Sequence, residues 1–148
     1  MYHLLIVDDE TAITDGLEEV LLSSGLNLIE VRKAYSARQA LELFQKRLFD
    51  IVISDIRMPG MDGLTAIEKL RPILENCQFI IFTAYEDFSY AKKALELGVM
   101  AYITKPVLKN EVIEKVSLAV KRLKERENRE LQRNMLPLRF QEYMVEFQ

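Results

Sequence analysis

Five polar residues of this 148-residue chain stand where short apolar runs end; they are Asp8, Asp9, Asp55, Thr83 and Lys105. The run before Asp55, Ile51-Val52-Ile53-Ser54, has the length and the β-branched composition of a buried strand. In a parallel sheet the carboxyl ends of the strands share one edge, which is where open α/β sheets bind ligands. We therefore expect these five side chains to converge on one ligand crevice.

The chemistry of this group points to a phosphoryl group. Three neighbouring carboxylates repel one another, and a divalent cation removes that repulsion. A few oxygen ligands suit Mg²⁺, which leaves coordination positions open for a phosphoryl oxygen. Lys105 adds a positive charge for a phosphate, and Thr83 adds a hydroxyl donor. The chain has no GxxxxGK or GxGxxG loop for a nucleotide, so the phosphoryl group must arrive from another molecule.

Five apolar runs alternate with five segments of helical periodicity. We predict strands over Leu4–Val7, Asn27–Lys33, Ile51–Asp55, Gln78–Phe82 and Val99–Thr104. We predict three helices over Thr11–Ser24, Gly63–Glu75 and Asp87–Leu97. A further helix follows a candidate N-cap at Ser36, and the last helix begins at Leu108. Pro72 should end the third helix early, near Arg71. Gly60 and Gly63 are interpreted as turn residues. The alternation predicts an α/β fold with a doubly wound, five-stranded parallel sheet.

Composition excludes several classes of protein. The chain has one cysteine, Cys77, and one histidine, His3, so it offers no internal disulfide and no histidine-based metal cluster. Hydrophobic residues make up 49% and charged residues 29%, as in ordinary globular proteins. No stretch is apolar enough to span a bilayer, and the N-terminus lacks the basic start of a signal peptide. We expect a cytoplasmic protein.

The net charge of −3 is unevenly distributed along the chain. Residues 1–120 carry a charge of −5, residues 121–133 carry +3, and residues 134–148 carry −1. Acids interleave the basic run, which favours a solvated helix face over a contact with DNA. We place a domain boundary near Leu123 and expect the charged segment after it to extend the last helix, with Pro137 interrupting any helix there.

Four motifs resemble those of a known family. Val7-Asp8-Asp9-Glu10, Asp55-Ile56-Arg57-Met58-Pro59-Gly60-Met61-Asp62-Gly63, Thr83-Ala84 and Lys105-Pro106 look like the receiver domain of two-component response regulators, in the family's order. The resemblance covers about residues 3–123. It implies the flavodoxin-like (βα)5 fold of that family and a phosphoacceptor at Asp55 that is fed by a sensor histidine kinase.

The same resemblance implies roles for the other site residues. Asp9 and Asp55 would bind Mg²⁺ directly, together with the backbone carbonyl of Arg57, and Asp8 would act mainly through a metal-bound water. Thr83 and Tyr102 would form a switch pair, and Lys105 would be the phosphate partner. The Lys105-Pro106 peptide bond is expected to be cis. Such a protein is not an enzyme, because its chemistry is limited to its own phosphorylation and dephosphorylation.

A finer likeness concerns the output. Residues 83–98 resemble receivers attached to AraC-type DNA-binding domains. We expect residues 124–148 to be a helical linker or tail that leads to an output domain absent from this chain. DNA would be contacted only through that domain. A second copy could bind through the surface of the fourth helix, the fifth strand and the fifth helix, and no membrane is expected as a partner.

Two rival functions remain open at this point. The first is a Mg²⁺-dependent phosphatase that forms an aspartyl phosphate. Such enzymes usually carry a second acid two residues after the nucleophile, and Arg57 occupies that position here, which argues against this rival. The second is an interaction module of the same shape that works without phosphorylation.

Overall fold

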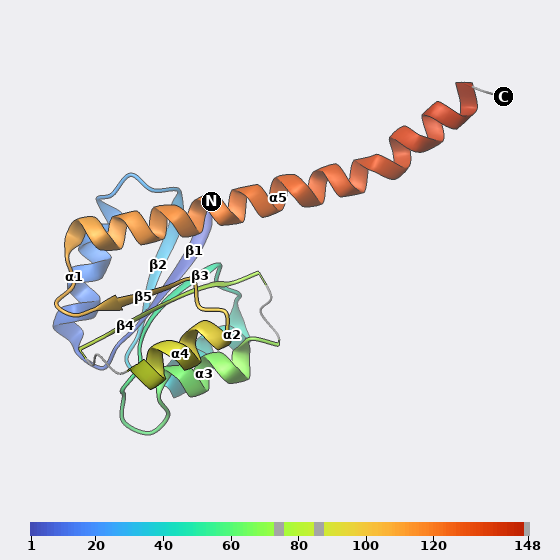
Figure 1. The fold of residues 1–148 in the computed structure, drawn as a ribbon. Helices are drawn as coiled ribbons and strands as arrows, with labels where there is room; N and C mark the ends of the chain where they lie inside the picture. Colours follow the sequence, from blue (N-terminus) through green and yellow to red (C-terminus); the bar gives the residue numbers. More distant parts are fainter. Residues whose placement is uncertain (73–75, 85–87, 147–148) are drawn as a thin grey trace.

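The computed structural model describes residues 1–72, 76–84 and 88–146, which form five strands and five helices in strict alternation (Figure 1). The strands are β1 (Tyr2–Val7), β2 (Leu28–Ala34), β3 (Ile51–Asp55), β4 (Gln78–Thr83) and β5 (Ala101–Thr104). The helices are α1 (Thr11–Leu22), α2 (Ala37–Lys46), α3 (Gly63–Leu70), α4 (Phe88–Glu96) and α5 (Lys109–Glu146). All ten predicted elements are therefore present, with boundaries that differ by a few residues.

The five strands form one parallel sheet in the order β2-β1-β3-β4-β5. The order reverses between β1 and β3, because the chain places β2 on one side of β1 and all later strands on the other. Such a reversal opens a crevice at the carboxyl ends of the two strands. The predicted doubly wound, five-stranded parallel sheet is confirmed, and its crevice lies beside the ends of β1 and β3.

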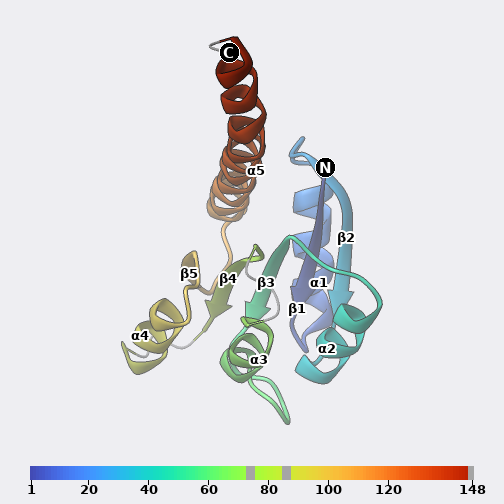
Figure 2. The same ribbon diagram turned by 90° about the vertical axis from the view of Figure 1, so that its right-hand side faces the viewer.

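Helices cover both faces of the sheet (Figures 1 and 2). One apolar cluster joins the sheet to α1 and α5, and its helical members include Leu17, Leu21, Val112 and Val116. The other cluster joins the opposite face to α2, α3 and α4 through residues such as Ala40, Ile67 and Ala94. All five residues of β3 are buried, as expected for a central strand with helices on both sides.

Capping side chains set the starts of two helices. The Ser36 side chain accepts a hydrogen bond from the backbone N–H of Gln39 at 3.1 Å, so the predicted N-cap of α2 is confirmed. Asp62 caps α3 in the same way through the backbone N–H of Thr65, at 2.8 Å. Helix α3 ends at Leu70, before Pro72, as predicted. Glu75, the predicted last residue of the third helix, and Asp87, the predicted first residue of the fourth helix, lie outside the described residues.

Helix α5 continues far beyond the sheet and leaves the domain as a single rod (Figures 1 and 2). Leu123 is its last residue in the apolar cluster, and the predicted domain boundary near this residue stays a prediction. Burial, and after it the interaction with the Glu127 carboxylate of this helix, raises the pKa of the Tyr2 hydroxyl. The prediction that Pro137 interrupts the helix was wrong: α5 runs through it to Glu146. A proline removes only one helical hydrogen bond, which a bend accommodates.

None of the helices in the described ranges carries an apolar stretch of the kind needed to cross a lipid bilayer.

Candidate functional site

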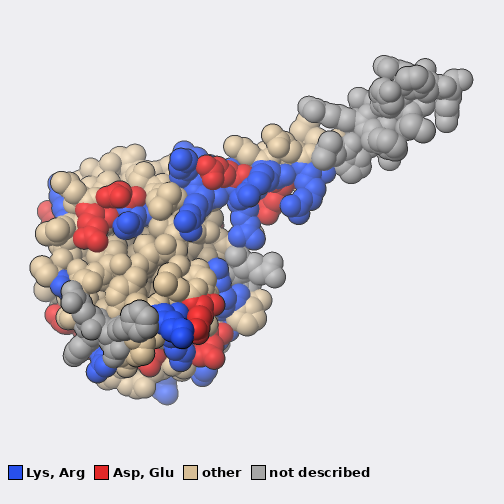
Figure 3. All heavy atoms as spheres, in the orientation of Figure 1, with Lys and Arg blue, Asp and Glu red and all other residues tan. Residues whose placement is uncertain are grey.

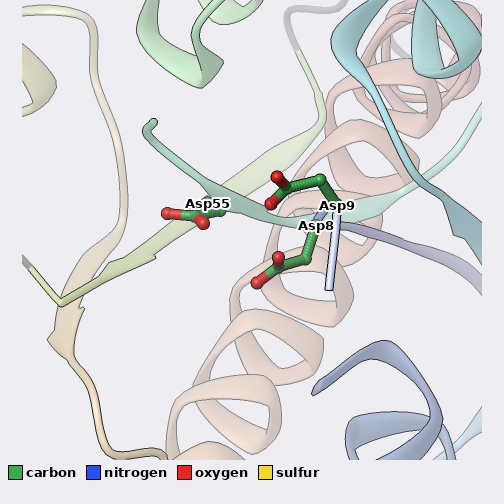
Figure 4. A group of neighbouring side chains, drawn as sticks. All are labelled: Asp8, Asp9 and Asp55. Carbon is green, nitrogen blue, oxygen red and sulfur yellow. The ribbon is translucent and has the colours of Figure 1, made fainter. Parts of the chain in front are cut away.

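Three carboxylates meet at the carboxyl end of the sheet, as the sequence predicts. Asp8 and Asp9 follow β1, and Asp55 is the last residue of β3. Each offers an oxygen atom that lies within 4.8 Å of an oxygen atom of the other two. Figure 4 shows the three side chains extending from these two neighbouring strands into the same space. Asp8 and Asp55 are buried, whereas Asp9 is exposed and lies at the rim.

Lys105 joins this group from the end of the edge strand β5. Its Nζ donates to Asp8 Oδ2 at 3.0 Å and to Asp55 Oδ2 at 3.2 Å. Its backbone N–H donates to the carbonyl of Thr83 at 2.7 Å. This bond to the end of β4 fixes the position of the Lys105 backbone, from which the side chain extends to the acids. The ammonium also lies 5.1 Å from the centre of the Phe82 ring. The Lys105-Pro106 peptide bond is cis, as predicted.

Burial and charge have opposite effects on the ionisation of this group. Burial raises the pKa of Asp8, and the charge of Asp55 adds to this effect. A backbone hydrogen bond from Glu10 at 2.9 Å and the Lys105 ammonium act in the other direction without outweighing burial. Burial alone would lower the pKa of Lys105, but its hydrogen bonds and ion pairs with Asp8 and Asp55 raise it. Lys105 therefore carries its positive charge at neutral pH.

The segment after β3 folds back tightly over Asp55. The backbone N–H of Ile56 donates to Asp55 Oδ1 at 2.7 Å, which leaves Lys105 to hold the other carboxylate oxygen. The N–H of Gly63 then closes the loop on the carbonyl of Ile56, also at 2.7 Å. A Cβ atom at position 63 would lie 2.1 Å from the carbonyl oxygen of Asp55. Gly63 is therefore required by this close approach, whereas the sequence indicated only a turn residue.

The remaining predicted residues surround this centre. Thr83 is fully buried at the end of β4, and Tyr102 is half-buried in β5 and packs against the apolar cluster under α4. The Arg57 side chain is exposed, and its guanidinium carbon lies 4.9 Å from the centre of the Tyr90 ring. This contact, which the sequence did not indicate, links the loop after the central acid to α4. The role of the Arg57 carbonyl stays a prediction.

The donor set fits a hard divalent cation. It consists of carboxylate oxygens alone, with no sulfur or imidazole among the clustered residues. Asp8, Asp9 and Asp55 together carry more negative charge than the single ammonium of Lys105 compensates. Asp9 at the exposed rim provides an entry from solvent, so a partly hydrated ion such as Mg²⁺ suits the site.

A doubly wound parallel sheet with clustered acids and a lysine at its carboxyl edge defines this protein as a receiver-type α/β domain. The family model described as "response regulator receiver domain" matches residues 4–117, and the chain belongs to that family. It is 35% identical over 124 residues to YesN, an uncharacterized transcriptional regulatory protein of Bacillus subtilis, and 32% identical over 126 residues to an uncharacterized response regulatory protein of Staphylococcus epidermidis.

Solved structures agree with this assignment. A response regulator receiver domain protein from Clostridium thermocellum is 28% identical to this chain and superposes with a TM-score of 0.76. The match covers 84% of this chain and 98% of that protein. The match to the Bacillus subtilis protein covers 84% of this chain but only 34% of that protein. The match to the Staphylococcus epidermidis protein covers 85% of this chain but only 49% of that protein. The chain thus spans between a third and a half of these two relatives.

A first prediction concerns Gly63. In the variant Gly63→Ala, the new methyl group would overlap the Asp55 carbonyl, so the loop has to move and the free energy of unfolding should fall by about 1–3 kcal/mol, as in overpacked sites. The measurement is urea unfolding. Gly16→Ala is the matched control: nothing lies within 4 Å of its Cβ position in α1, and it should stabilise by about 0.5–1 kcal/mol. Equal effects of the two changes would contradict the close approach.

A second prediction concerns Lys105. Lys105→Met keeps the apolar stem but leaves two buried carboxylates without their cation, so at neutral pH the variant should lose about 1–3 kcal/mol of unfolding free energy. A raised pKa means that folded Asp8 holds its proton more tightly than unfolded Asp8. Asp8 therefore lowers the free energy of unfolding as the pH rises above the pKa of the unfolded chain, and by the full amount above the raised folded pKa. The loss should therefore shrink as the pH falls.

Urea unfolding of the variant and the wild type, at neutral pH and in mild acid, measures this effect. Lys92→Met, at an exposed lysine of α4, is the control and should change little at either pH. A Lys105→Met variant as stable as the wild type at neutral pH would show that the ammonium does not compensate the acids.

Proposed function

We propose that this protein is a phosphoacceptor: the Asp55 carboxylate accepts a phosphoryl group from a phosphohistidine of a sensor histidine kinase. The observation that carries the proposal is the bridge from Lys105 Nζ to Asp8 Oδ2 and Asp55 Oδ2, at 3.0 and 3.2 Å. This geometry fixes a cation beside the one buried acid of the central strand. The family supplies the partner, because receiver domains act together with histidine kinases.

In the proposed transfer, an oxygen of Asp55 attacks the phosphorus atom, the P–N bond to the donor histidine breaks, and an acyl phosphate forms. The Ile56 N–H holds Oδ1 and Lys105 holds Oδ2, so the carboxylate is oriented before the donor arrives. The Lys105 ammonium then compensates the charge that accumulates on the phosphoryl oxygens. Asp8, Asp9, Asp55 and the carbonyl of Arg57 are the groups that would hold Mg²⁺, which when bound neutralises negative charge around the phosphoryl group.

The acyl phosphate would act as a switch through Thr83 and Tyr102. A dianion on Asp55 draws in the Thr83 hydroxyl from the end of β4, and the space that this opens lets Tyr102 of β5 turn inward. The surface formed by α4, β5 and α5 changes in consequence. Moving an equilibrium from 1:99 to 99:1 requires about 5.5 kcal/mol of differential stabilisation. New bonds from the dianion to Lys105 and to Thr83 would supply part of it.

The output would be transcription. YesN of Bacillus subtilis is named a transcriptional regulatory protein and is longer than the matched stretch, which supports a DNA-binding output domain joined through α5. The AraC type rests on the resemblance of residues 83–98 to receivers attached to such domains. The switched surface would bind a second copy of the chain. The protein would meet its kinase in the cytoplasm. It would not turn over a separate substrate, because its phosphoryl chemistry ends on its own Asp55.

Treatment with acetyl phosphate and Mg²⁺ tests the acceptor. We expect peptide mass spectrometry to locate one phosphoryl group on Asp55 and Asp55→Asn to abolish labelling, because the amide nitrogen is no nucleophile. Asp15→Asn removes an exposed acid of α1 that pairs with Lys33 and should label at the wild-type rate. Phosphate on another residue, or labelling that survives in Asp55→Asn, would refute the proposal. Continuous release of phosphate from small esters would instead indicate a phosphatase.

Thermal unfolding in the presence of Mg²⁺ tests the metal site. Binding to the folded state should raise the melting temperature, with about 2.7 kcal/mol gained when the ion stands at a hundred times its dissociation constant. Asp9→Asn should shift the titration midpoint to about tenfold higher Mg²⁺ or more, the equivalent of about 1.4 kcal/mol. Glu10→Gln is the matched control, because Glu10 is the exposed neighbour of Asp9 outside the acidic cluster. A wild-type melting temperature insensitive to Mg²⁺ would exclude the site.

A further inference from the structure

A hollow of about 420 Å³ lies between α1 and the start of α5, on the face of the sheet that these two helices cover (Figure 1). This volume lies within the range of about 300–1,000 Å³ that is usual for small-molecule pockets. The lining residues of α1 run from Ala12 to Val20, about 12 Å along the helix at 1.5 Å per residue, so the hollow is elongated. Its walls are mostly apolar and include Ile13, Leu17, Pro106, Val107 and Val112.

A glycine in α1 leaves one wall of this hollow open. Gly16 lines the hollow, and a Cβ atom at this position would meet nothing within 4 Å. Glycine weakens the interior of a helix relative to alanine, so helix stability does not explain this residue. Close packing within the chain does not explain it either, in contrast to Gly63, whose Cβ would overlap a carbonyl oxygen. An occupant of the hollow that contacts the backbone at Gly16 would explain it.

The charged residues that line the hollow are two lysines, and no acid is among the lining residues. The ammonium of Lys105 is held by Asp8 and Asp55, which leaves Lys109 as the cation that a ligand could meet. Lys109 is exposed and forms no ion pair with a carboxylate of the described residues.

The sequence around Lys109 also lacks an acid that could neutralise it along the helix. The residues three and four positions away, where helical side chains meet, are Lys105, Pro106, Val112 and Ile113. Glu111 stands two positions later, about 200° around the helix, so it does not face Lys109. The hollow therefore combines an elongated apolar wall with one cation at its exposed rim.

We propose that this hollow binds a medium-chain fatty carboxylate, with the apolar chain along α1 and the carboxylate at Lys109. An extended hydrocarbon chain matches the elongated apolar wall, and a carboxylate matches a single cation at the rim. A nucleotide or a sugar phosphate fits less well, because its many polar groups would lie against apolar side chains without hydrogen-bond partners.

The proposal goes beyond the phosphoacceptor function, because it adds a ligand that takes no part in phosphoryl transfer. Pro106 and Val107 follow Lys105 directly in the chain, so the ligand would contact the segment that carries the lysine of the acidic site. Binding needs no phosphoryl group on Asp55, so the two proposals fail separately.

A titration of the ¹⁵N-labelled protein with octanoate, followed by NMR, tests the site. We expect saturable shifts centred on the backbone N–H groups of Gly16, Val107 and Val112. Gly16→Leu places a side chain in the hollow and should weaken binding by about tenfold or more. Leu is a better helix former than Gly and the position is exposed, so the fold is retained, as circular dichroism would verify. Ser117→Leu, at an exposed position of α5 outside the hollow, is the control and should bind like the wild type.

A second pair of variants tests the carboxylate. Lys109→Met keeps an apolar stem and should weaken octanoate binding by about two- to fivefold, as for the loss of an exposed ion pair. It should leave the binding of 1-octanol unchanged. Figure 3 shows Lys and Arg gathered over the stretch of α5 that leaves the body, where anions could collect without any hollow. Lys124→Met, at an exposed lysine of that stretch, is therefore the matched control and should bind octanoate like the wild type.

Three results would overturn the proposal. The first is the absence of saturable shifts at millimolar octanoate, and the second is wild-type affinity in Gly16→Leu. The third is octanoate binding that Lys109→Met leaves unchanged, or weakens no more than Lys124→Met does. The hollow would then be an apolar face for a protein partner, or general charge would attract the anion.

Discussion

The ion pairs of Lys105 with Asp8 and Asp55 are the interaction on which the carboxyl edge of the sheet depends. Both acids are almost wholly buried, and burying an unpaired carboxylate costs far more than a domain of this size can spare. One ammonium, reaching across from the end of β5, gives each acid a partner at hydrogen-bond distance. The same contacts tie together the ends of β1, β3 and β5, so the charge balance of the site is also part of the fold.

That balance explains how a chemical change at one oxygen reaches distant elements. The bridge leaves the site with excess negative charge, and the phosphoryl group of the proposed switch would add more. The donors nearest the site would then rearrange: Lys105 is tied to the end of β4, and the loop after Asp55 is tied to α4 by the stacking of Arg57 on Tyr90. Each connection reaches an element on the α4 side of the sheet. In the proposed switch, charge added at Asp55 would therefore act first on the elements of that side.

Sequence alone predicted the elements, the strand ends and the residues at the centre, because local periodicity and the rule for parallel sheets suffice for them. It did not predict contacts that depend on two segments approaching through space. Gly63 looked like an ordinary turn residue until the Asp55 carbonyl proved to lie where its Cβ would be. The stacking of Arg57 on Tyr90 joins a loop to helix α4 and leaves no local pattern. The prediction that Pro137 ends the helix failed for the opposite reason. The rule that proline breaks a helix is local, whereas the long helix α5 tolerates the loss of one backbone hydrogen bond.

Helix α5 connects the site to the surface beyond the domain. It begins at Lys109, four residues after Lys105, and its first half packs on the sheet through Val112, Val116 and Leu123. A 38-residue helix is about 57 Å long, and its backbone hydrogen bonds make it move largely as one body. A small rotation at its packed half is therefore a larger displacement at its free half. In the proposed switch, a change of charge at the site would therefore displace the free half of α5 more than its packed half.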